Sequence, residues 1–207
     1  MTQTQKDRDA LREWAVFYEA GLRRRNSDVN LTQAQIARER ARLEADPVEW
    51  IKFFFPEYCK FEFADFQTKA IRRCIKNEEW FEVLSWARGL AKSTTVMFIV
   101  MYLTLTGRKC NVMMASATQD SATRLLDPYK KQFEENALIR AYYGVQVNPG
   151  NWCAEEFVAK CGCSFRAVGA GNAPRGSRNG AIRPDVLLVD DFDTDEAVRN
   201  PLSLIHI

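Results

Sequence analysis

The segment Trp80–Thr95, WFEVLSWARGLAKSTT, decides which fold the sequence predicts. From Phe81 to Trp86, large apolar residues alternate with other residues, which is typical of a β-strand. Residues 87–91 are mostly small, and the apolar stretch that opens with Lys92-Ser93-Thr94-Thr95 indicates a helix. The segment therefore predicts a strand, a loop and a helix in direct succession.

This order of elements predicts a loop that binds phosphate. Backbone amides of small residues can turn toward a phosphate, and the N-terminus of the following helix would point the same way. Lys92 would supply positive charge to the β- and γ-phosphates of a nucleotide, and the hydroxyl of Ser93 could hold Mg²⁺. No other site in the sequence combines these features.

The loop departs from the common pattern G-x-x-x-x-G-K-[ST], because Trp86 and Ala91 stand at the two glycine positions. Ala91 adds a methyl group where the backbone would approach phosphate. We therefore expect a negative φ at Ala91, whereas glycine could adopt either sign. The alternative is an ordinary strand-to-helix turn with one exposed lysine, and the loop alone does not decide between the two.

Composition fits one globular domain. The chain has 207 residues, of which 46% are hydrophobic and 27% charged, and its formal net charge is +2. Because this net charge is small, the surface as a whole is not basic. Any contact with nucleic acid would therefore use local clusters of basic residues. Three such clusters exist, although each is also typical of a solvated helix face: Arg23–Arg25, Arg72-Arg73 and Lys130-Lys131.

The N-terminus, MTQTQKDRDALREW, lacks the apolar run of a signal peptide, and no later stretch is long and uncharged enough to span a membrane. We therefore expect a cytoplasmic protein without a membrane partner. The six cysteines form no C-x-x-C pair and the only histidine is His206, so we expect no zinc site. Cys153, Cys161 and Cys163 could be three ligands, but we expect all six thiols to be reduced and structural.

Local signals place the helices before the loop. Residues 1–45 predict an N-terminal appendage of two helices, Asp9–Leu22 and Thr32–Glu44, separated by a polar turn. Asp46-Pro47 offers an N-cap followed by proline at the first helical position, which predicts a short apolar helix that stops at Pro56.

After the loop we expect a helix over residues 93–106 closed by Gly107, and then a strand over residues 111–117. With the strand before the loop, these elements make one βαβ unit. The next helix should break and restart at Asp127-Pro128. Residues 156–167 predict a hairpin that turns at Cys161-Gly162, and residues 169–180 predict a glycine-rich basic loop containing Arg175 and Arg178, with Arg183 just beyond it.

Phe66-Gln67 stands at the start of a predicted helix, 25 residues before Lys92. A glutamine amide has both donor and acceptor groups, so it can recognise the edge of adenine. The alternative is a surface glutamine on an amphipathic helix, and a neighbouring phosphate loop favours the first interpretation.

A second chemical motif comes near the end of the chain. The apolar run Val186–Val189 is followed by Asp190, Asp191 and Asp193, which is the Walker B pattern. A wholly apolar run predicts a strand buried on both faces, with its carboxylates at the edge where α/β sheets bind ligands. Asp190 would take part in the Mg²⁺ shell and Asp191 would orient or deprotonate the attacking water. The alternative is an acidic turn that happens to follow a strand.

Five segments together resemble the large terminase subunit of tailed bacteriophages. They are Phe66-Gln67, Ala87–Thr94, Ser116–Thr118, Arg175-Gly176 and Arg183–Asp191, which cover about residues 46–200 in order and spacing. In that family the phosphate loop usually lacks its first glycine and carries an arginine four residues before the lysine, where Arg88 stands. Alanine at the position of Ala91 also has precedent there.

The resemblance implies an α/β fold of the P-loop NTPase type, ASCE or RecA-like, with a central, mostly parallel sheet flanked by helices. It implies an ATPase that drives double-stranded DNA into a capsid. Its partners would be double-stranded DNA, the capsid portal protein, the small terminase subunit and further copies in a ring, in the host cytoplasm.

The resemblance also assigns roles to residues. Gln67 would contact adenine, and the phosphates would bind Arg88, Gly89, Leu90, Ala91, Lys92, Ser93 and Thr94. Ser93 and Asp190 would hold Mg²⁺, and the catalytic residues would be Arg88, Lys92 and Asp191. Many members have glutamate directly after the metal-binding aspartate, whereas this chain has Asp191, with Asp193 also nearby, so either could activate water.

Two alternatives share these motifs. One is a helicase-like or RecA-like ATPase that depends on DNA, and the other is a degenerate remnant without catalysis. The resemblance also implies a coupling segment and a nuclease domain after Asp191, but the sequence continues for only about 15 residues. We therefore expect residues 46–201 to be a partial ATPase domain with an exposed sheet edge. Residues 202–207, LSLIHI, match one reading frame of a sequencing adapter, so we expect a non-native tail.

Overall fold

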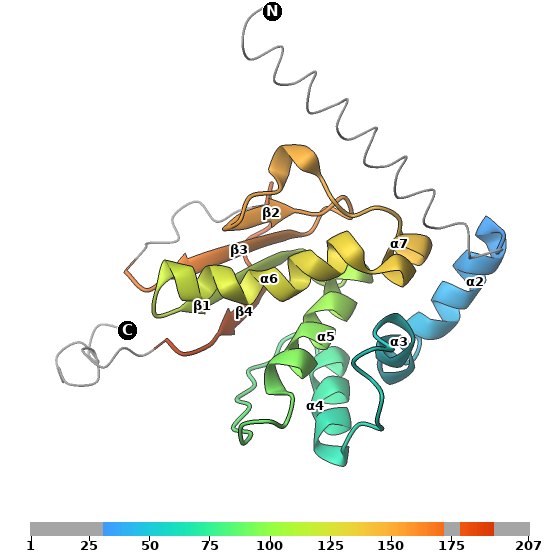
Figure 1. Cartoon of the computed structure of the whole chain (residues 1–207), viewed down its shortest axis with the longest axis horizontal. Coiled ribbons are helices and arrows are strands. Elements are labelled where there is room, and N and C mark those ends of the chain that lie inside the picture. The colour runs from blue at the N-terminus through green and yellow to red at the C-terminus, as the bar shows by residue number, and fades with distance from the viewer. Residues whose placement is uncertain (1–30, 172–178, 193–207) are drawn as a thin grey trace, which may run out of the picture. The chain divides into compact units, whose positions relative to one another are not determined.

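The computed structural model of the chain describes residues 31–171 and 179–192. The chain forms two compact units: unit 1 comprises Met1–Arg108 and Gln132–Gln146, and unit 2 comprises Lys109–Lys131 and Val147–Ile207. Figure 1 gives the course of the chain and the element labels. The predicted helix Asp9–Leu22 lies outside the described residues.

Unit 1 is helical. Its helices are α2 (Gln33–Glu44), α3 (Pro47–Phe54), α4 (Asp65–Lys76), α5 (Lys92–Leu105), α7 (Ala137–Tyr143) and the last turn of α6 (Gln119–Glu135). The predicted start signals are confirmed, because the Thr32 hydroxyl accepts the amide of Gln35 and the Asp46 carboxylate accepts the amides at the start of α3. Capping of this kind satisfies donors that the first helical turn leaves free.

Aromatic side chains fill the core of unit 1. Trp50 is fully buried in α3, with its ring centroid 4.7 Å from that of Phe54 and 5.2 Å from that of Tyr102. Tilted and edge-to-face contacts of this kind add to the stabilisation from burial. The core residues that α3 contributes are Val48, Trp50, Ile51 and Phe54.

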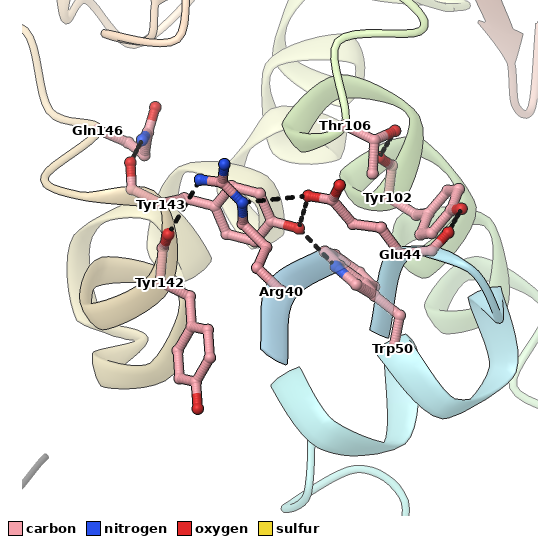
Figure 2. Close-up of polar contacts among 8 residues, drawn as sticks. All are labelled: Arg40, Glu44, Trp50, Tyr102, Thr106, Tyr142, Tyr143 and Gln146. Atoms are coloured by element: carbon pink, nitrogen blue, oxygen red, sulfur yellow. Dashed lines mark hydrogen bonds and ion pairs between the residues drawn. The ribbon is translucent and has the colours of Figure 1, made fainter. Parts of the chain in front are cut away.

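A polar network crosses this aromatic core (Figure 2). The indole nitrogen of Trp50 donates to the hydroxyl of Tyr143 at 2.8 Å, and this hydroxyl donates to Glu44 Oε1 at 2.8 Å. Arg40 Nε lies 3.5 Å from the same carboxylate oxygen. Burial raises the pKa of Tyr143, so its hydroxyl remains a donor across the physiological range. The network thus joins α2, α3 and α7.

Tyr143→Phe should destabilise the chain by about 2 kcal/mol, because the buried indole N–H of Trp50 would lose its acceptor. Tyr142→Phe is the matched control, since no hydrogen bond of the Tyr142 hydroxyl to another described residue is found and this hydroxyl points away from the network in Figure 2. Urea unfolding followed by tryptophan fluorescence compares the two. Equal midpoints for both variants would contradict this role of Tyr143.

Unit 2 contains a mixed, mostly parallel sheet of four strands in the order β2-β3-β1-β4. The strands are β1 (Asn111–Ser116), β2 (Glu156–Val158), β3 (Ser164–Gly169) and β4 (Val186–Val189), and a short 3₁₀ helix, η1 (Pro149–Asn151), precedes β2. β1 pairs in parallel with both β3 and β4. β2 and β3 form the predicted antiparallel hairpin.

Residues 119–131 of α6 run along one face of this sheet (Figure 1). Leu126 and Tyr129 are buried there, and the ring of Tyr129 lies 5.8 Å from that of Phe165 on β3. The predicted break at Asp127-Pro128 is wrong, because α6 is continuous from Gln119 to Glu135 with Pro128 inside it. Packing of this apolar face against the sheet can offset the one backbone hydrogen bond that proline removes.

The predicted strand Phe81–Trp86 is also wrong. Residues 80–87 pair with no other described strand, and the side chains of Phe81 and Val83 are 91% and 72% exposed. Alternation of apolar residues predicts a strand only where a neighbouring strand can pair with it, and no described strand does so here. The predicted βαβ unit therefore lacks its first strand.

β4 is confirmed as a strand but not as one buried on both faces. Its residues alternate between half-buried and exposed, with Leu187 62% and Val189 56% exposed. Among the described strands β4 lies at the edge of the sheet and pairs only with β1. Because residues two positions apart on a strand project from the same face, Leu187 and Val189 both lie on the more exposed face of β4.

Candidate functional site

The loop before α5 has an unusual backbone conformation. Gly89 has a φ of 89°, and Ala91 has a φ of 55° and a ψ of 34°, which is left-handed. The expectation of a negative φ at Ala91 is therefore wrong. A left-handed residue other than glycine costs roughly 1–2 kcal/mol. The Ala91 carbonyl accepts both the amide and the hydroxyl of Thr95 at 2.9 Å, which helps to hold this conformation.

The first turn of α5 is open to an anion. Ala91 supplies no capping side chain, and the turn contains no acidic residue. The first amides of a helix have no partner within the helix, so they attract negative charge together with the helix dipole. Lys92 is half-buried, while Ser93 and Arg88 are exposed. Neither Arg88 nor Lys92 forms an ion pair with another described residue.

Helix α4 supports both ends of the loop. The Phe66 ring contacts that of Trp86 with centroids 4.8 Å apart, and Gln67 Nε2 donates to the Leu90 carbonyl at 3.2 Å. Gln67 Oε1 accepts the amide of Ala64 at 2.9 Å. The structure thus brings the Phe66-Gln67 pair to the phosphate-loop candidate, as the spacing indicated. Here the Gln67 amide positions the loop backbone, and its contact with adenine stays a prediction.

In unit 2, the second set of predicted residues lies at the carboxyl edge of the sheet. The amide of Asp190 donates to the Ala115 carbonyl at 3.0 Å, and the amide of Ala117 donates to the Asp191 carbonyl at 3.1 Å. These bonds extend the pairing of β1 and β4 beyond the strands themselves. Asp190 is half-buried, whereas Asp191 is exposed and has a φ of 44°. Aspartate tolerates this left-handed conformation better than most residues.

Asp190 lies close enough to Tyr129 of α6 to act on it electrostatically. Burial, and then the negative charge of Asp190, raise the pKa of Tyr129. The buried phenol therefore stays neutral beside the carboxylate.

The structure adds two residues at this sheet to which sequence reasoning gave no role. Gln119 bridges to β3, since its Nε2 donates to the Ala167 carbonyl at 3.2 Å and its Oε1 accepts the Gly169 amide at 3.0 Å. At the opposite edge, the Asp185 carboxylate accepts the amides of Cys110 and Asn111, each at 2.8 Å. The order Pro184-Asp185 before a strand was the only sequence signal for this clamp.

The predicted residues thus fall into two sets, one in each unit. Unit 1 holds Gln67, Arg88, Gly89, Leu90, Ala91, Lys92, Ser93 and Thr94, and unit 2 holds Asp190 and Asp191. Arg175, Arg178 and Asp193 lie outside the described residues, while Arg183 is described and exposed.

The predicted Mg²⁺ ligands Ser93 and Asp190 lie in different units, and each is an oxygen group of the kind that Mg²⁺ prefers. In the described ranges 31–171 and 179–192, no group of three or more His, Cys, Asp or Glu side chains could hold a metal ion. Mg²⁺ at nucleotide sites needs no such group, because one or two protein ligands, substrate phosphates and waters complete its shell. The Ser93 hydroxyl and the Asp190 carboxylate are ligands of the required kind.

No protein-family model, curated protein or solved structure matches this chain. Within the part of the chain that the structure describes, no helix is both long and apolar enough to cross a membrane. Assignment of function therefore depends on the residues of the loop and of the sheet edge.

Proposed function

We propose that this chain binds ATP with Mg²⁺ and is the ATPase part of a DNA-packaging motor of the terminase type, with a P-loop NTPase fold. The observation that carries ATP binding is the loop Ala87–Ala91, with two residues at positive φ leading directly into an uncapped helix that begins with Lys92. A left-handed residue other than glycine is kept where surrounding structure fixes it, often at ligand sites.

In this proposal the loop amides and the first turn of α5 bind the phosphates, and Arg88 and Lys92 neutralise their charge. Mg²⁺, when bound, would neutralise phosphate charge further and align the leaving group. Asp191 would orient the attacking water. Phosphoryl transfer needs little covalent chemistry from a protein, so positioned charges can account for most of the catalysis.

The packaging role rests on the sequence resemblance, above all on Arg88 four residues before Lys92 and on Asp190-Asp191 after an apolar strand. The proposed partners are double-stranded DNA, the portal protein, the small terminase subunit and further copies of the chain. The proposed location of the motor is the host cytoplasm. An exposed Arg88 without a described ion-pair partner is compatible with a role at phosphate.

Asp190→Asn should lower the affinity for ATP about 10- to 150-fold in the presence of Mg²⁺ and leave it unchanged in EDTA, because a carboxylate that bonds the metal shell contributes about 1.5–3 kcal/mol. Asp191→Asn is the matched control and should bind like the wild type in both conditions. Calorimetric titration of all three proteins measures this. If Asp191→Asn instead lost the Mg²⁺-dependent affinity, the two roles would have to be exchanged.

Stimulation by DNA tests the packaging role separately. ATP hydrolysis by the protein should rise with double-stranded DNA more than with single-stranded DNA. The opposite preference would favour a helicase-like or RecA-like ATPase. Absence of nucleotide binding in calorimetry would favour the non-catalytic remnant and would contradict the proposed function.

A further inference from the structure

Three of the six cysteines gather at the amino ends of β1 and β3 in unit 2. Cys110 directly precedes β1, Cys163 directly precedes β3, and Cys161 lies in the turn of the hairpin. The parallel pairing aligns Asn111 with Ser164, so Cys110 and Cys163 precede two residues that are register partners. Neighbouring strands are about 4.8 Å apart, which is within the range of Cα separations that disulfides span.

The three thiols contact one another through Cys163. The Cys163 side chain hydrogen-bonds to the side chains of both Cys161 and Cys110, and its Sγ lies 3.4 Å from the Lys109 carbonyl oxygen. The turn itself is fixed, because the Cys163 carbonyl accepts the amide of Ala159 and Asn179 Nδ2 donates to the Gly162 carbonyl at 2.7 Å. Cys161 and Cys163 are thus neighbours in a fixed turn, two positions apart in the chain.

These thiols differ in access and in protonation. Cys161 is exposed and Cys163 is buried. The hydrogen bond from Cys163, together with backbone amides, lowers the pKa of Cys161 to about 7. The same hydrogen bond, and then burial, raise the pKa of Cys163. An exposed thiolate beside a protonated thiol has the properties of a redox-sensitive pair.

We propose that Cys161 and Cys163 are a peroxide-oxidisable dithiol, in which the Cys161 thiolate reacts first and the Cys163 thiol resolves the product. Cys161 attacks hydrogen peroxide, its sulfur is oxidised to sulfenic acid, and the leaving hydroxide takes a proton to become water. The Cys163 sulfur then attacks the sulfenic sulfur, releasing a second water and forming the disulfide. The sequence suggested structural roles for all six cysteines, so this pair departs from that expectation.

The proposal is separate from ATP binding. The cysteines lie at the amino edge of the sheet, whereas Asp190 lies at its carboxyl edge. The disulfide would cross-link the turn of the β2–β3 hairpin, and thiol reductants would reverse it.

Peptide mapping of the full chain tests the proposal. The protein is treated with hydrogen peroxide at pH 7, the remaining thiols are alkylated with iodoacetamide, and the protein is digested with trypsin. Cleavage after Lys160 and Arg166 gives CGCSFR, which contains Cys161 and Cys163 together. We expect this peptide to become 2 Da lighter than its reduced form and to escape alkylation. A first product that links it to the peptide of Cys110 would overturn the assignment of Cys163 as the resolving thiol of Cys161.

The rate comparison uses Cys153, the other exposed thiol of the described residues, as an internal control. A lowered pKa leaves a larger share of Cys161 as the reactive thiolate at pH 7, and this gain exceeds the loss of nucleophilicity that accompanies a lower pKa. Cys161 should therefore react with peroxide several-fold faster than Cys153. Equal rates in the wild-type protein would overturn the proposal.

Variants separate the two steps of the reaction. Cys163→Ser should trap the sulfenic acid on Cys161, which dimedone then labels, whereas Cys161→Ser should leave no dimedone-reactive group in CGCSFR. Cys153→Ser should behave like the wild type. Labelling of Cys163 in the Cys161→Ser protein at the wild-type rate would show that Cys161 is not the attacking thiolate.

Discussion

Lys92→Ala should lower the affinity for ATP by about 100-fold or more, which is the largest functional effect that we expect from one substitution. Lys92 opens α5 and has no ion-pair partner among the described residues, so its charge is free to meet a phosphate. Removing a charged hydrogen-bond donor from a bound anion costs about 1.5–3 kcal/mol, and loss of its Coulomb attraction adds to this.

The fold should tolerate this change, because alanine is the best helix former and Lys92 makes no described ion pair. Lys76→Ala is the matched control, since Lys76 is an exposed lysine in the last turn of α4. Calorimetry measures ATP binding, and thermal unfolding checks that both variants fold. Equal ATP affinities for Lys92→Ala and Lys76→Ala would remove the loop as the phosphate site.

Features that depend on a few neighbouring residues could be predicted from the sequence. The caps at Thr32 and Asp46, the helix end at Gly107 and the turn at Cys161-Gly162 all use local chemistry. Such signals act within one turn of chain, so they can be recognised without knowing the neighbours in space.

Features that depend on distant residues could not be predicted in the same way. Phe81–Trp86 has the alternation of a strand, but alternation does not supply a partner strand. Likewise, the apolar run Val186–Val189 does not reveal that β4 lies at an edge of the described sheet. The left-handed φ of Ala91 depends on the start of α5, and propensity alone predicts the opposite sign.

The candidate site likewise has features that could be predicted from the sequence and features that could not. The charges of Arg88, Lys92 and Asp190 follow from the residue types, so these candidates could be recognised in the sequence. Supporting contacts do not, because Gln67 reaches the Leu90 carbonyl across 23 positions and Gln119 reaches β3 across about 50. Cys110 likewise joins Cys161 and Cys163 only through the register of β1 and β3.

Gly169 at the end of β3 shows how tightly these distant contacts constrain the chain. A Cβ at this position would lie 2.4 Å from the backbone nitrogen of Gln119 and 2.8 Å from the carbonyl carbon of Thr118. The start of α6 cannot move away freely, because the Gln119 side chain bonds to Ala167 and to Gly169 itself. Adding a methyl group therefore requires separating two backbones that are bonded together.

Gly169→Ala should accordingly destabilise the chain by about 3 kcal/mol, as expected when a close-packed contact must open. Gly150→Ala is the matched control, because a Cβ at Gly150 meets no atom within 4 Å and its φ is not positive. The control should stay within about 0.5 kcal/mol of the wild type. Urea unfolding midpoints compare the two, and a Gly169→Ala protein as stable as Gly150→Ala would mean that β3 and α6 do not approach as closely as described. Since this contact also holds the carboxyl edge of the sheet, we expect Gly169→Ala to loosen the edge that carries Asp190.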